Sequence, residues 1–521
     1  MSDPSLTQAL RKGQRERPNE TAAICGTERI SRAQLADRVA RLAGVLQQLG
    51  MAPGDRVGML SLNSIRFVEY FYGCWWGGGV VNPVNIRWSP KEVAYSLDDC
   101  DTRLLIVDDT FAPMVPALRA FSKSLATVIY VGRGPVPEGL VDAEALMAGQ
   151  APVPDAGRGG ADLAAVMYTG GTTGHPKGVM LSHANLYINA LSNMGTVPRQ
   201  SVRASLVVAP MFHVAGCGVS IINLMRLATM VIVPAFDEVA ILTALQQHRA
   251  NELFLVPTMI QRVVDHPRFA EFDLSSVKLV LYGAAPIDAA LLARAMERLP
   301  GAGFAQAYGM TELSPTITVL VPEQHLPGPN QARWLRSAGR PVPIAEVRVV
   351  DAEGQDCPVG TVGEICTRGP MVMQGYWHKP AETAAALQDG WMHTGDAGRF
   401  DEDGFLYVVD RLKDMVVTGG ENVYSAEVEN AIAQLPQVAM CAVIGVPDDQ
   451  WGERVHAVIV LREGASIDEA TVVAHCKTLI AGYKCPRSVE FRAALPITAA
   501  GKLQKFALRE PHWAGRQRRV N

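Results

Sequence analysis

The spacing of apolar residues predicts a chain in which amphipathic helices alternate with short buried strands. From Leu35 to Leu49, apolar residues recur at steps of three and four behind a helix-capping Ser31, and Gly50 ends the pattern. A second amphipathic pattern covers residues 66–76. Apolar runs short enough for buried strands lie at 55–60, 80–81, 104–107, 206–208, 253–256 and 277–282. Such alternation favours parallel sheets covered by helices on both faces.

The last third of the chain has a different pattern and predicts further subdomains. Between residues 338 and 411, short strand-like runs are separated by Gly, Pro and Asp turns, as in an antiparallel, barrel-like subdomain. Beyond Met415 we expect a compact α+β unit, with helices at 426–435 and 469–479 and strands at 438–446 and 455–461. Residues 133–160 are rich in Gly, Pro and Ala and are expected to form a surface connection.

Composition and charge narrow the classes of function. With 48% hydrophobic and 19% charged residues and a net charge of −4, the chain gives no reason to expect a nucleic-acid partner. Its nine cysteines show no metal-binding spacing, which is typical of reduced thiols in a cytoplasmic protein. Pro210, His213 and Asn223 interrupt the apolar stretch 205–225. We therefore expect buried core there and no integral membrane segment.

The stretch with the clearest chemistry is Tyr168-Thr169-Gly170-Gly171-Thr172-Thr173-Gly174-His175-Pro176-Lys177-Gly178. Glycines let backbone N–H groups turn toward a ligand, the threonines add hydroxyl groups, and Lys177 adds a full charge. These groups together predict a polyphosphate site, with a plain Gly-rich hairpin as the alternative. The pattern differs from the P-loop of NTPases, because Gly178 follows Lys177 where that motif needs Ser or Thr.

Other stretches follow this loop in a characteristic order. They are Tyr308-Gly309-Met310-Thr311-Glu312, Trp391 to Asp396, Asp410 to Asp414, Gly419 to Val423, and Gly501-Lys502. Together they closely resemble the adenylate-forming superfamily of acyl-CoA synthetases, luciferases and peptide-synthetase adenylation domains, in its AMP-forming acyl-CoA ligase branch. The resemblance covers nearly the whole chain. One departure is Gly170, which stands where the family often has Ser or Thr.

The resemblance implies ATP, Mg²⁺ and coenzyme A as cofactors. A carboxylate that attacks the α-phosphate of ATP brings two anions together, so positive charge must already be in place. Thr311 would contact the α-phosphate, and Glu312 would hold Mg²⁺, partly through water. His213 joins this catalytic set at the start of the acyl-binding stretch. The β- and γ-phosphates are assigned to Thr169, Gly170, Gly171, Thr172, Thr173, Gly174 and Lys177.

The same resemblance assigns the nucleoside contacts. Asp396 would accept hydrogen bonds from both ribose hydroxyls, and Arg411 would be a second ribose contact. Tyr308 and Gly309 would lie against the adenine, with Gly283, Ala284 and Ala285 as the turn on its other side. Without the family, Asp396 would be a turn residue after a glycine, and Glu312 would be an acidic group at a helix N-terminus.

The family also implies an α/β fold with a mobile domain. Residues 1–410 would form an N-terminal domain of two α/β subdomains plus the barrel-like subdomain, 411–414 a hinge around Lys413, and 415–521 a small α+β domain. Lys502 would bridge the attacking carboxylate and the α-phosphate in the transition state. After rotation, Gly419 and Gly420 would let pantetheine pass, and Trp451 would contact CoA.

We therefore expect an AMP-forming carboxylate–CoA ligase that acts on a hydrophobic monocarboxylic acid, either a medium- or long-chain fatty acid or an aryl acid. Residues 211–222 contain a His but no Arg or Lys, so a second carboxylate would be buried without a partner. The sequence leaves open which acid is used and whether a homodimer forms.

Three alternatives compete with this interpretation. An enzyme that loads a carrier protein would share the adenylation step, although residues 210–216 contain no acid to pair an amino-acid amine. A luciferase-type oxygenase would use the same adenylate. A non-catalytic nucleotide-binding relative would have no need of Lys177, Glu312, Asp396, Arg411 and Lys502 together.

Overall fold

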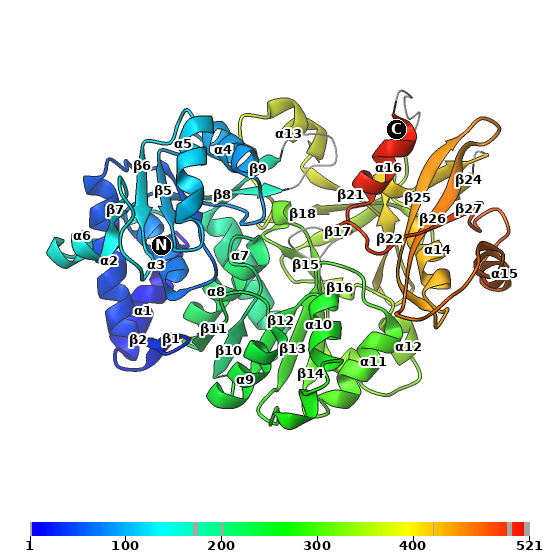
Figure 1. Ribbon diagram of the computed structural model, residues 1–521, viewed down its shortest axis with the longest axis horizontal. Coiled ribbons are helices and arrows are strands. Elements are labelled where there is room, and N and C mark those ends of the chain that lie inside the picture. Colours follow the sequence, from blue (N-terminus) through cyan, green and yellow to red (C-terminus); the bar gives the residue numbers. More distant parts are fainter. Residues whose placement is uncertain (1–2, 170–175, 200–202, 420, 498–502, 515–521) are drawn as a thin grey trace. The chain divides into compact units, whose positions relative to one another are not determined.

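The computed structural model describes residues 3–169, 176–199, 203–419, 421–497 and 503–514, and all structural statements concern these residues. The chain divides into two compact units (Figure 1). One contains Met1–Glu346 and Arg368–Met392, and the other contains Val347–Thr367 and His393–Asn521. The domain boundary expected at 411–414 stays a prediction.

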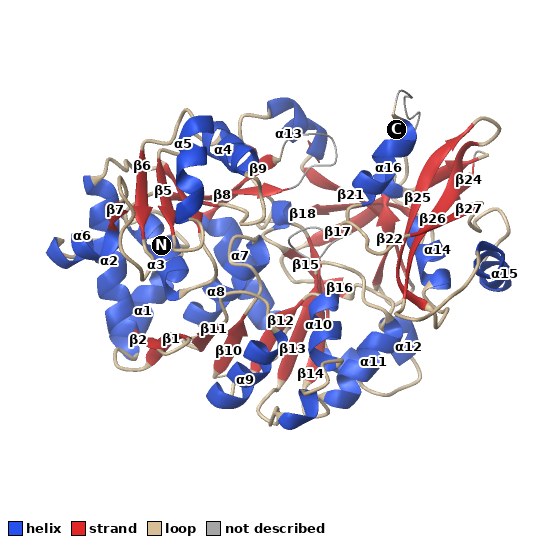
Figure 2. Ribbon diagram, in the orientation of Figure 1, coloured by secondary structure: helices blue, strands red, loops and turns tan. Residues whose placement is uncertain are grey.

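An eight-stranded sheet forms one half of the first unit (Figure 2). Its strands, in spatial order, are β19 (Gly375–Tyr376), β9 (Lys177–Ser182), β8 (Leu163–Thr169), β4 (Val80–Pro83), β3 (Arg56–Leu60), β5 (Leu104–Val107), β6 (Thr127–Tyr130) and β7 (Val141–Asp142). The strands from β8 to β7 run parallel, whereas β9 is antiparallel to β8. The helices in this part of the chain are α1 (Gln8–Glu16), α2 (Arg32–Gln48), α3 (Ile65–Trp76), α4 (Pro90–Asp99), α5 (Val115–Phe121) and α6 (Ala143–Gly149).

A nine-stranded sheet forms the other half. Its order is β16 (Arg340–Pro341), β15 (Thr316–Leu320), β14 (Gly303–Gly309), β13 (Leu279–Gly283), β12 (Glu252–Leu255), β10 (Ala204–Val207), β11 (Thr229–Ile232), β1 (Thr21–Cys25) and β2 (Glu28–Ser31). Helices α9 (Glu238–His248), α10 (Pro257–Val264) and α11 (Ala289–Arg298) pack an apolar layer onto one face (Figure 1). The remaining elements of this unit are α7 (His183–Thr196), α8 (Val214–Met225), α12 (Gln331–Trp334), α13 (Pro380–Ala386) and β20 (Leu387–Gln388).

Local sequence explains where several helices begin. The Ser31 hydroxyl accepts from the Gln34 N–H, and the Gln34 side chain accepts from the Ser31 N–H, which is a capping box at the start of α2. The same arrangement of Ser182 and Asn185 starts α7. The helices predicted from the apolar pattern at 35–49 and 66–76 are confirmed as α2 and α3.

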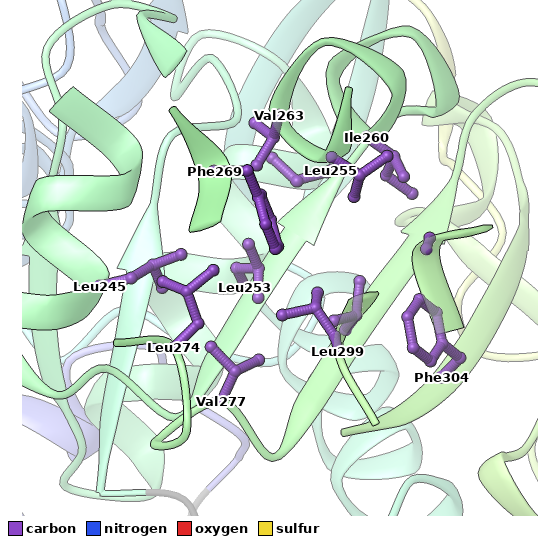
Figure 3. A pocket seen from close by; sticks show the side chains of 13 residues that line it. Leu245, Leu253, Leu255, Ile260, Val263, Phe269, Leu274, Val277, Leu299 and Phe304 are labelled. Carbon is purple, nitrogen blue, oxygen red and sulfur yellow. The ribbon is translucent and has the colours of Figure 1, made fainter. Parts of the chain in front are cut away.

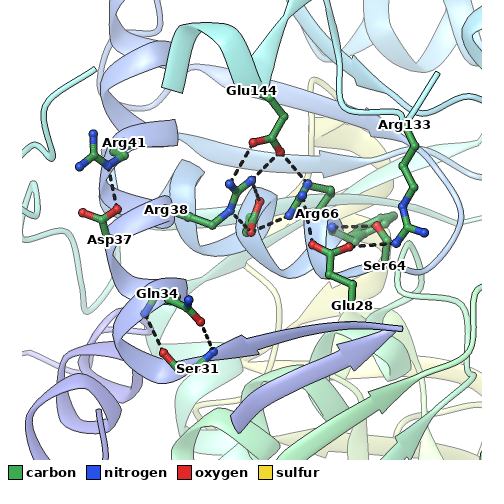
Figure 4. A network of polar contacts seen from close by, with 12 residues as sticks. Glu28, Ser31, Gln34, Asp37, Arg38, Arg41, Ser64, Arg66, Arg133 and Glu144 are labelled. Carbon is green, nitrogen blue, oxygen red and sulfur yellow. Dashed lines mark hydrogen bonds and ion pairs between the residues drawn. The ribbon is translucent and has the colours of Figure 1, made fainter. Parts of the chain in front are cut away.

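An ionic network ties the helices of the eight-stranded half together (Figure 4). Glu69 of α3 is 1% exposed. Its Oε1 atom lies 2.6 Å from Nε of Arg38 in α2 and 3.0 Å from the guanidinium group of Arg66. Arg38 also contacts Glu144 of α6 at 2.6 Å. Burial lowers the pKa of Arg38, but its hydrogen bonds to Glu69 and Glu144 outweigh burial and raise the pKa overall. The charge of the buried Glu69 carboxylate is therefore compensated by the guanidinium groups of Arg38 and Arg66.

The second unit contains two further sheets. In the first, β18 (Gly363–Arg368) lies between β17 (Glu346–Val350) and β21 (Trp391–Phe400), and β22 (Leu406–Arg411) pairs with β21. The second sheet contains β23 (Val416–Thr418), β24 (Glu421–Val423), β25 (Val438–Asp448), β26 (Gly452–Leu461) and β27 (Ser488–Phe491). Its helices are α14 (Ser425–Ile432), α15 (Glu469–Leu479) and α16 (Lys505–Trp513). The expected α/β class, with an antiparallel sheet and a small α+β part, is confirmed.

Two details differ from the sequence prediction. The stretch 133–160 contains β7 and α6, because Asp142 caps that helix by accepting from the Glu144 and Ala145 N–H groups. The stretch 338–411 does not form one sheet, since β16 joins the nine-stranded sheet and β19 pairs with β9. Residues 205–225 form β10 and α8, and no helix in the described part of the chain is long and apolar enough to span a membrane.

Candidate active site

The Gly- and Thr-rich stretch joins two paired strands of the eight-stranded sheet. Thr169 ends β8 and Lys177 begins β9, and these two residues are direct partners in the antiparallel ladder. Residues 170–175 between them lie outside the described residues. The antiparallel ladder of β8 and β9 therefore fixes Thr169 and Lys177, the two described ends of the predicted phosphate-binding stretch.

Lys177, Tyr376 and Glu312 lie together although they are far apart in the sequence. The Lys177 Nζ atom lies 4.8 Å from the centroid of the Tyr376 ring. The Tyr376 hydroxyl donates a 2.9 Å hydrogen bond to Oε1 of Glu312, whose residue is 5% exposed. Burial and the Glu312 carboxylate raise the pKa of Tyr376, so its hydroxyl stays protonated and donates. One phenol ring therefore links the predicted phosphate cation to the predicted Mg²⁺ carboxylate.

Buried backbone contacts fix the short 3₁₀ turn Thr311–Leu313 that carries Glu312. The Asn189 side-chain amide of α7 donates to the carbonyls of Leu313 at 3.2 Å and Thr316 at 2.8 Å. The Met373 N–H donates to the Glu312 carbonyl at 2.8 Å. Thr311 and Glu312 are thus held from both sides, by α7 and by the segment that leads into Tyr376.

The residues assigned to the adenine gather at one edge of the nine-stranded sheet. Gly283 pairs with Ala307 across the parallel strands β13 and β14, and a Cβ atom at Gly283 would lie 2.2 Å from the Ala307 oxygen. Ala284 follows at a φ of 64°, in the left-handed region, and leads to Ala285. Tyr308 follows Ala307. These positions are at the carboxyl ends of neighbouring parallel strands, where open α/β sheets bind ligands.

Helix α8, which His213 precedes, lies near the segment that follows Tyr308. His213 occupies the N-cap position of α8, and its ring lies 4.4 Å from that of Phe212. A Cβ atom at Gly218 would lie 3.8 Å from Cδ of Pro315. A Cβ atom at Gly309 would lie 1.8 Å from the Pro315 oxygen, so only glycine fits there. The stretch predicted to bind the acyl group therefore lies next to Pro315.

An enclosed void elsewhere in this unit is no substitute for that pocket. It lies within the apolar layer beneath α9, α10 and α11, lined by Leu245, Leu253, Phe269 and similar side chains (Figure 3). Its volume is about 10 Å³, which is at the lower limit for one water molecule. With its apolar lining, it is a packing gap and not a ligand site.

A more open groove lies beside Tyr376. It has a volume of about 450 Å³, and its lining includes Tyr376, Lys379 and residues of α13. The Lys379 ammonium group lies 3.6 Å from Asp99. The groove is therefore lined by the largely buried Tyr376 and by the ammonium group of Lys379.

Asp396 and Arg411 face each other in the second unit. They are direct partners across β21 and β22, and Arg411 Nε lies 3.4 Å from Oδ1 of Asp396. The Asp396 side chain is 11% exposed, whereas that of Arg411 is 47% exposed. The Thr394 hydroxyl accepts from the Asp396 N–H at 3.1 Å and donates to the Ile365 carbonyl at 2.7 Å. The two residues assigned to the ribose are thus one fixed pair.

Lys413 lies in the 3₁₀ turn Leu412–Asp414, directly after this pair. Burial, and after it the nearby Arg411 cation, lowers the pKa of Lys413 to about 8. Arg509 of α16 donates to the Lys413 carbonyl and to Asp414, each at 3.2 Å. The predicted hinge residue is therefore anchored through its backbone.

Gly419 and Trp451, both assigned to CoA, are in contact. The Gly419 N–H donates to the Trp451 carbonyl at 2.9 Å. Gly419 has a φ of 60°, and a Cβ atom there would lie 2.8 Å from the Trp451 ring. The Trp451 indole is nevertheless 45% exposed, so it is available to a ligand.

Some predicted residues cannot be placed, and others were missed. Gly170, Gly171, Thr172, Thr173, Gly174, Gly420 and Lys502 lie outside the described residues, so their roles stay predictions. Tyr376 and Asn189 were not predicted. Tyr376 stands in a two-residue strand that gives no periodic signal, and Asn189 looks like any polar residue on a helix.

The metal-binding potential of Glu312 comes from its chemistry and not from a ready-made cage. Among the described residues, no cluster of three metal-ligating side chains includes Glu312. Mg²⁺ typically binds through one or two carboxylates, with substrate phosphates and water completing the shell. A single buried carboxylate that is linked to Lys177 through Tyr376 fits that requirement.

Comparison with known proteins gives one consistent answer. A family model described as an AMP-binding enzyme matches residues 10–377, and one described as an AMP-binding enzyme C-terminal domain matches 427–502. The chain is 42% identical over 493 residues to feruloyl-CoA synthase of an Amycolatopsis species, covering 94% of this chain and 96% of that protein.

A second relative and a solved structure extend the comparison. The chain is 34% identical over 526 residues to the fatty acid–[acyl-carrier-protein] ligase ScoC of Streptomyces coeruleorubidus, covering 99% and 98% of the two chains. ATP-bound MatB from Rhodopseudomonas palustris has the same fold, with a TM-score of 0.88 and 32% identity over 98% of this chain and 99% of that one.

Proposed function

The chain belongs to the AMP-binding enzyme family, and we propose that within it this protein is an ATP-dependent carboxylate–CoA ligase. It joins a carboxylic acid to CoA through an acyl-adenylate and releases AMP and pyrophosphate. The observation that carries the proposal is the contact set Lys177–Tyr376–Glu312. It supplies a cation and a buried carboxylate beside the Gly- and Thr-rich hairpin, as a nucleotide–metal complex requires.

In the first half-reaction the substrate carboxylate attacks the α-phosphorus, and the bond to the bridging oxygen of pyrophosphate breaks. Lys177 holds the β- and γ-phosphates, and Thr311 donates to the α-phosphate. Glu312 would hold Mg²⁺, which supplies charge neutralisation on the phosphate oxygens when bound. Tyr376 positions the Glu312 carboxylate. Lys502, by its match to the family motif, stabilises charge shared between the carboxylate and the α-phosphate.

The nucleoside is recognised by separate residues. Tyr308 and the turn of residues 283–285 accommodate the adenine. Asp396 accepts from the ribose hydroxyls, and Arg411 keeps the Asp396 carboxylate oriented at 3.4 Å. A carboxylate accepts two hydroxyl hydrogen bonds better than a neutral amide does.

In the second half-reaction the CoA thiol attacks the acyl carbonyl, a thioester forms, and AMP and a proton leave. Gly419 and Gly420 give pantetheine a path without side chains, and Trp451 contacts CoA. Lys413 is the hinge residue at which the enzyme switches from the first half-reaction to the second. Lys502→Ala should therefore abolish adenylation yet still convert supplied acyl-AMP and CoA. Gly420→Leu should do the reverse, and equal loss of both steps in Lys502→Ala would contradict this division.

The substrate is a hydrophobic monocarboxylate, with aryl acids ahead of fatty acids. The start of α8 carries His213 but no Arg or Lys in residues 211–222, so a second carboxylate would be buried without a partner. The 42% identical relative is a feruloyl-CoA synthase, which favours an aryl-propenoic acid.

A product assay over a panel of acids tests the proposal. Ferulate, benzoate, octanoate, palmitate and succinate should be supplied with ATP, Mg²⁺ and CoA, and AMP, ADP, pyrophosphate and the thioester measured together. We expect AMP and pyrophosphate in equal amounts, with the highest kcat/KM for a hydrophobic acid. ADP and phosphate as products would refute the reaction type, and succinate as the best acid would refute the substrate class.

A carrier protein as acceptor is the second candidate, because ScoC is a ligase of fatty acids to acyl-carrier protein. A competition between CoA and a phosphopantetheinylated carrier protein in the same assay separates the two acceptors.

All nine cysteines are free thiols, which supports a cytoplasmic location as a further proposal. A homodimer is proposed only as a state to test, by light scattering.

A further inference from the structure

The second unit contains a cluster of metal-ligating side chains that the proposed reaction does not use. His456 of β26, Glu490 of β27 and His512 of α16 place one ligand atom each within 4.8 Å of the others. Two imidazoles and a carboxylate are a ligand set that binds Zn²⁺ and related divalent transition ions. We propose that these three residues form a Zn²⁺-class binding site that ties α16 to the sheet.

The secondary structure explains why the three residues meet. His456 and Ser488 are direct partners in the parallel pair β26–β27. Glu490 stands two residues beyond Ser488, on the same face of the sheet. Leu508 of α16 packs in one apolar cluster with residues of this sheet. His512 follows Leu508 by one helical turn, so it lies on the same face of α16.

The hydrogen bonding of the buried His456 imidazole suits a metal ligand. Its Nδ1 is hydrogen-bonded to the Ser488 hydroxyl at 2.8 Å, while its Nε2 is buried and has no hydrogen-bond partner among the described residues. The residue is 7% exposed. The Nδ1 atom of His456 is therefore fixed by Ser488, which leaves Nε2 for a ligand. A metal-bound His typically uses its second nitrogen in this way to fix its orientation.

The carboxylate of Glu490 is divided between two partners. Its Oε1 is held by Arg492 Nε at 2.5 Å, and its Oε2 faces His456 Nε2 at 3.6 Å. That distance is too long for a hydrogen bond. Two ligands that share an ion through bonds of roughly 2.0–2.1 Å lie about 3.3–3.6 Å apart. The separation therefore fits a shared cation better than a direct contact.

His512 completes the set from the helix. Its ring centroid lies 5.1 Å from that of His456. The Trp513 indole N–H donates to the Gly445 carbonyl at 3.0 Å, which anchors this end of α16 against β25. Three ligands from three elements leave further positions on the ion for water, as in open zinc sites. Occupancy would cross-link α16 to β26 and β27 and stabilise this unit.

Zinc binding by the full-length, tag-free protein tests the site. The background should carry Cys366→Ser and His393→Gln, because Glu364, Cys366 and His393 form a second possible cluster. After chelator treatment, calorimetry with Zn²⁺ alone should show one bound equivalent and a raised unfolding temperature. Absence of zinc binding by this protein would overturn the proposal.

Variants locate the binding. His512→Ala, on the helix surface, should weaken Zn²⁺ binding at least 100-fold while leaving the metal-free unfolding temperature unchanged. Ser488→Ala should weaken it by about 10- to 100-fold, as expected for a residue that orients a ligand. His475→Gln, a histidine of the same unit outside the cluster, should bind as the parent does. Unchanged affinity in His512→Ala would place the zinc elsewhere and refute the assignment.

Discussion

Removing the Tyr376 hydroxyl is the sharpest test of how the proposed Mg²⁺ carboxylate is held. In Tyr376→Phe the ring near Lys177 remains, but Glu312 loses its 2.9 Å hydrogen bond in a buried setting. A hydrogen bond to a charged group contributes about 1.5–3 kcal/mol. If all of this acts in the transition state, kcat/KM for adenylation falls by roughly 10- to 160-fold.

The assay is pyrophosphate release at several Mg²⁺ concentrations, because a carboxylate that has lost its orientation should need more Mg²⁺. Tyr376→Leu also removes the contact between the Lys177 ammonium and the ring, and should lose about 0.5–2 kcal/mol more. Tyr187→Phe is the matched control, since its hydroxyl donates a 3.3 Å hydrogen bond to the exposed side chain of Gln8.

One result would refute the reasoning. If Tyr376→Phe kept kcat/KM within twofold of the parent and showed the same Mg²⁺ dependence, the hydroxyl would not position Glu312. A loss of thermal stability without any change in Mg²⁺ dependence would give Tyr376 a purely structural role. The Tyr187→Phe control must remain at the parent value for either conclusion.

Three further predictions concern other parts of the molecule. Gly419→Ala should raise KM for CoA and spare adenylation, because the new Cβ would lie 2.8 Å from the Trp451 indole. Gly464→Ala is the control and should not raise KM, because Gly464 has a similar φ of 74° with open space around it. Equal effects in the two variants would contradict a steric role. The pKa of Lys413 is lowered in the folded state from 10.5 to about 8, so between these pH values the unfolded chain binds more protons than the folded chain. The free energy of unfolding should therefore rise with pH through this window. Urea unfolding of Lys413→Gln should show a flatter rise, and the same rise as in the parent would disprove the burial effect. Arg38→Met leaves Glu69 buried without its closest cation and should lower the free energy of unfolding by about 3–5 kcal/mol; a loss below 1 kcal/mol, within the range of surface pairs, would contradict it.

Local sequence determined those features that depend on neighbouring residues. The start of α2 follows from Ser31 and Gln34, which satisfy each other's backbone groups within one turn. Its buried face follows from leucines at helical spacing. The glycines and threonines between Thr169 and Lys177 likewise led to the prediction of a polyphosphate site, which stays a prediction. The same local rules missed α6, because its cap at Asp142 lies in a stretch rich in Gly and Pro.

The functional prediction came from the order of the motifs along the chain, but only the tertiary structure determines which residues lie in contact. The contact of Tyr376 with Glu312 and Lys177 joins three strands or turns that are distant in the chain. It depends on β19 pairing with β9, and a two-residue strand has no periodicity from which that pairing could be predicted.

Strand register decided the remaining pairs. Asp396 faces Arg411 because β21 and β22 pair in that register, with an irregularity at residues 397–398. A shift of one residue would turn either side chain to the other face of the sheet. His456, Glu490 and His512 meet for the same reason, since a parallel strand pair and a helix bring them together from separate parts of the chain. Residue type and local spacing are written in the sequence, whereas register and long-range pairing are settled only when the whole core packs.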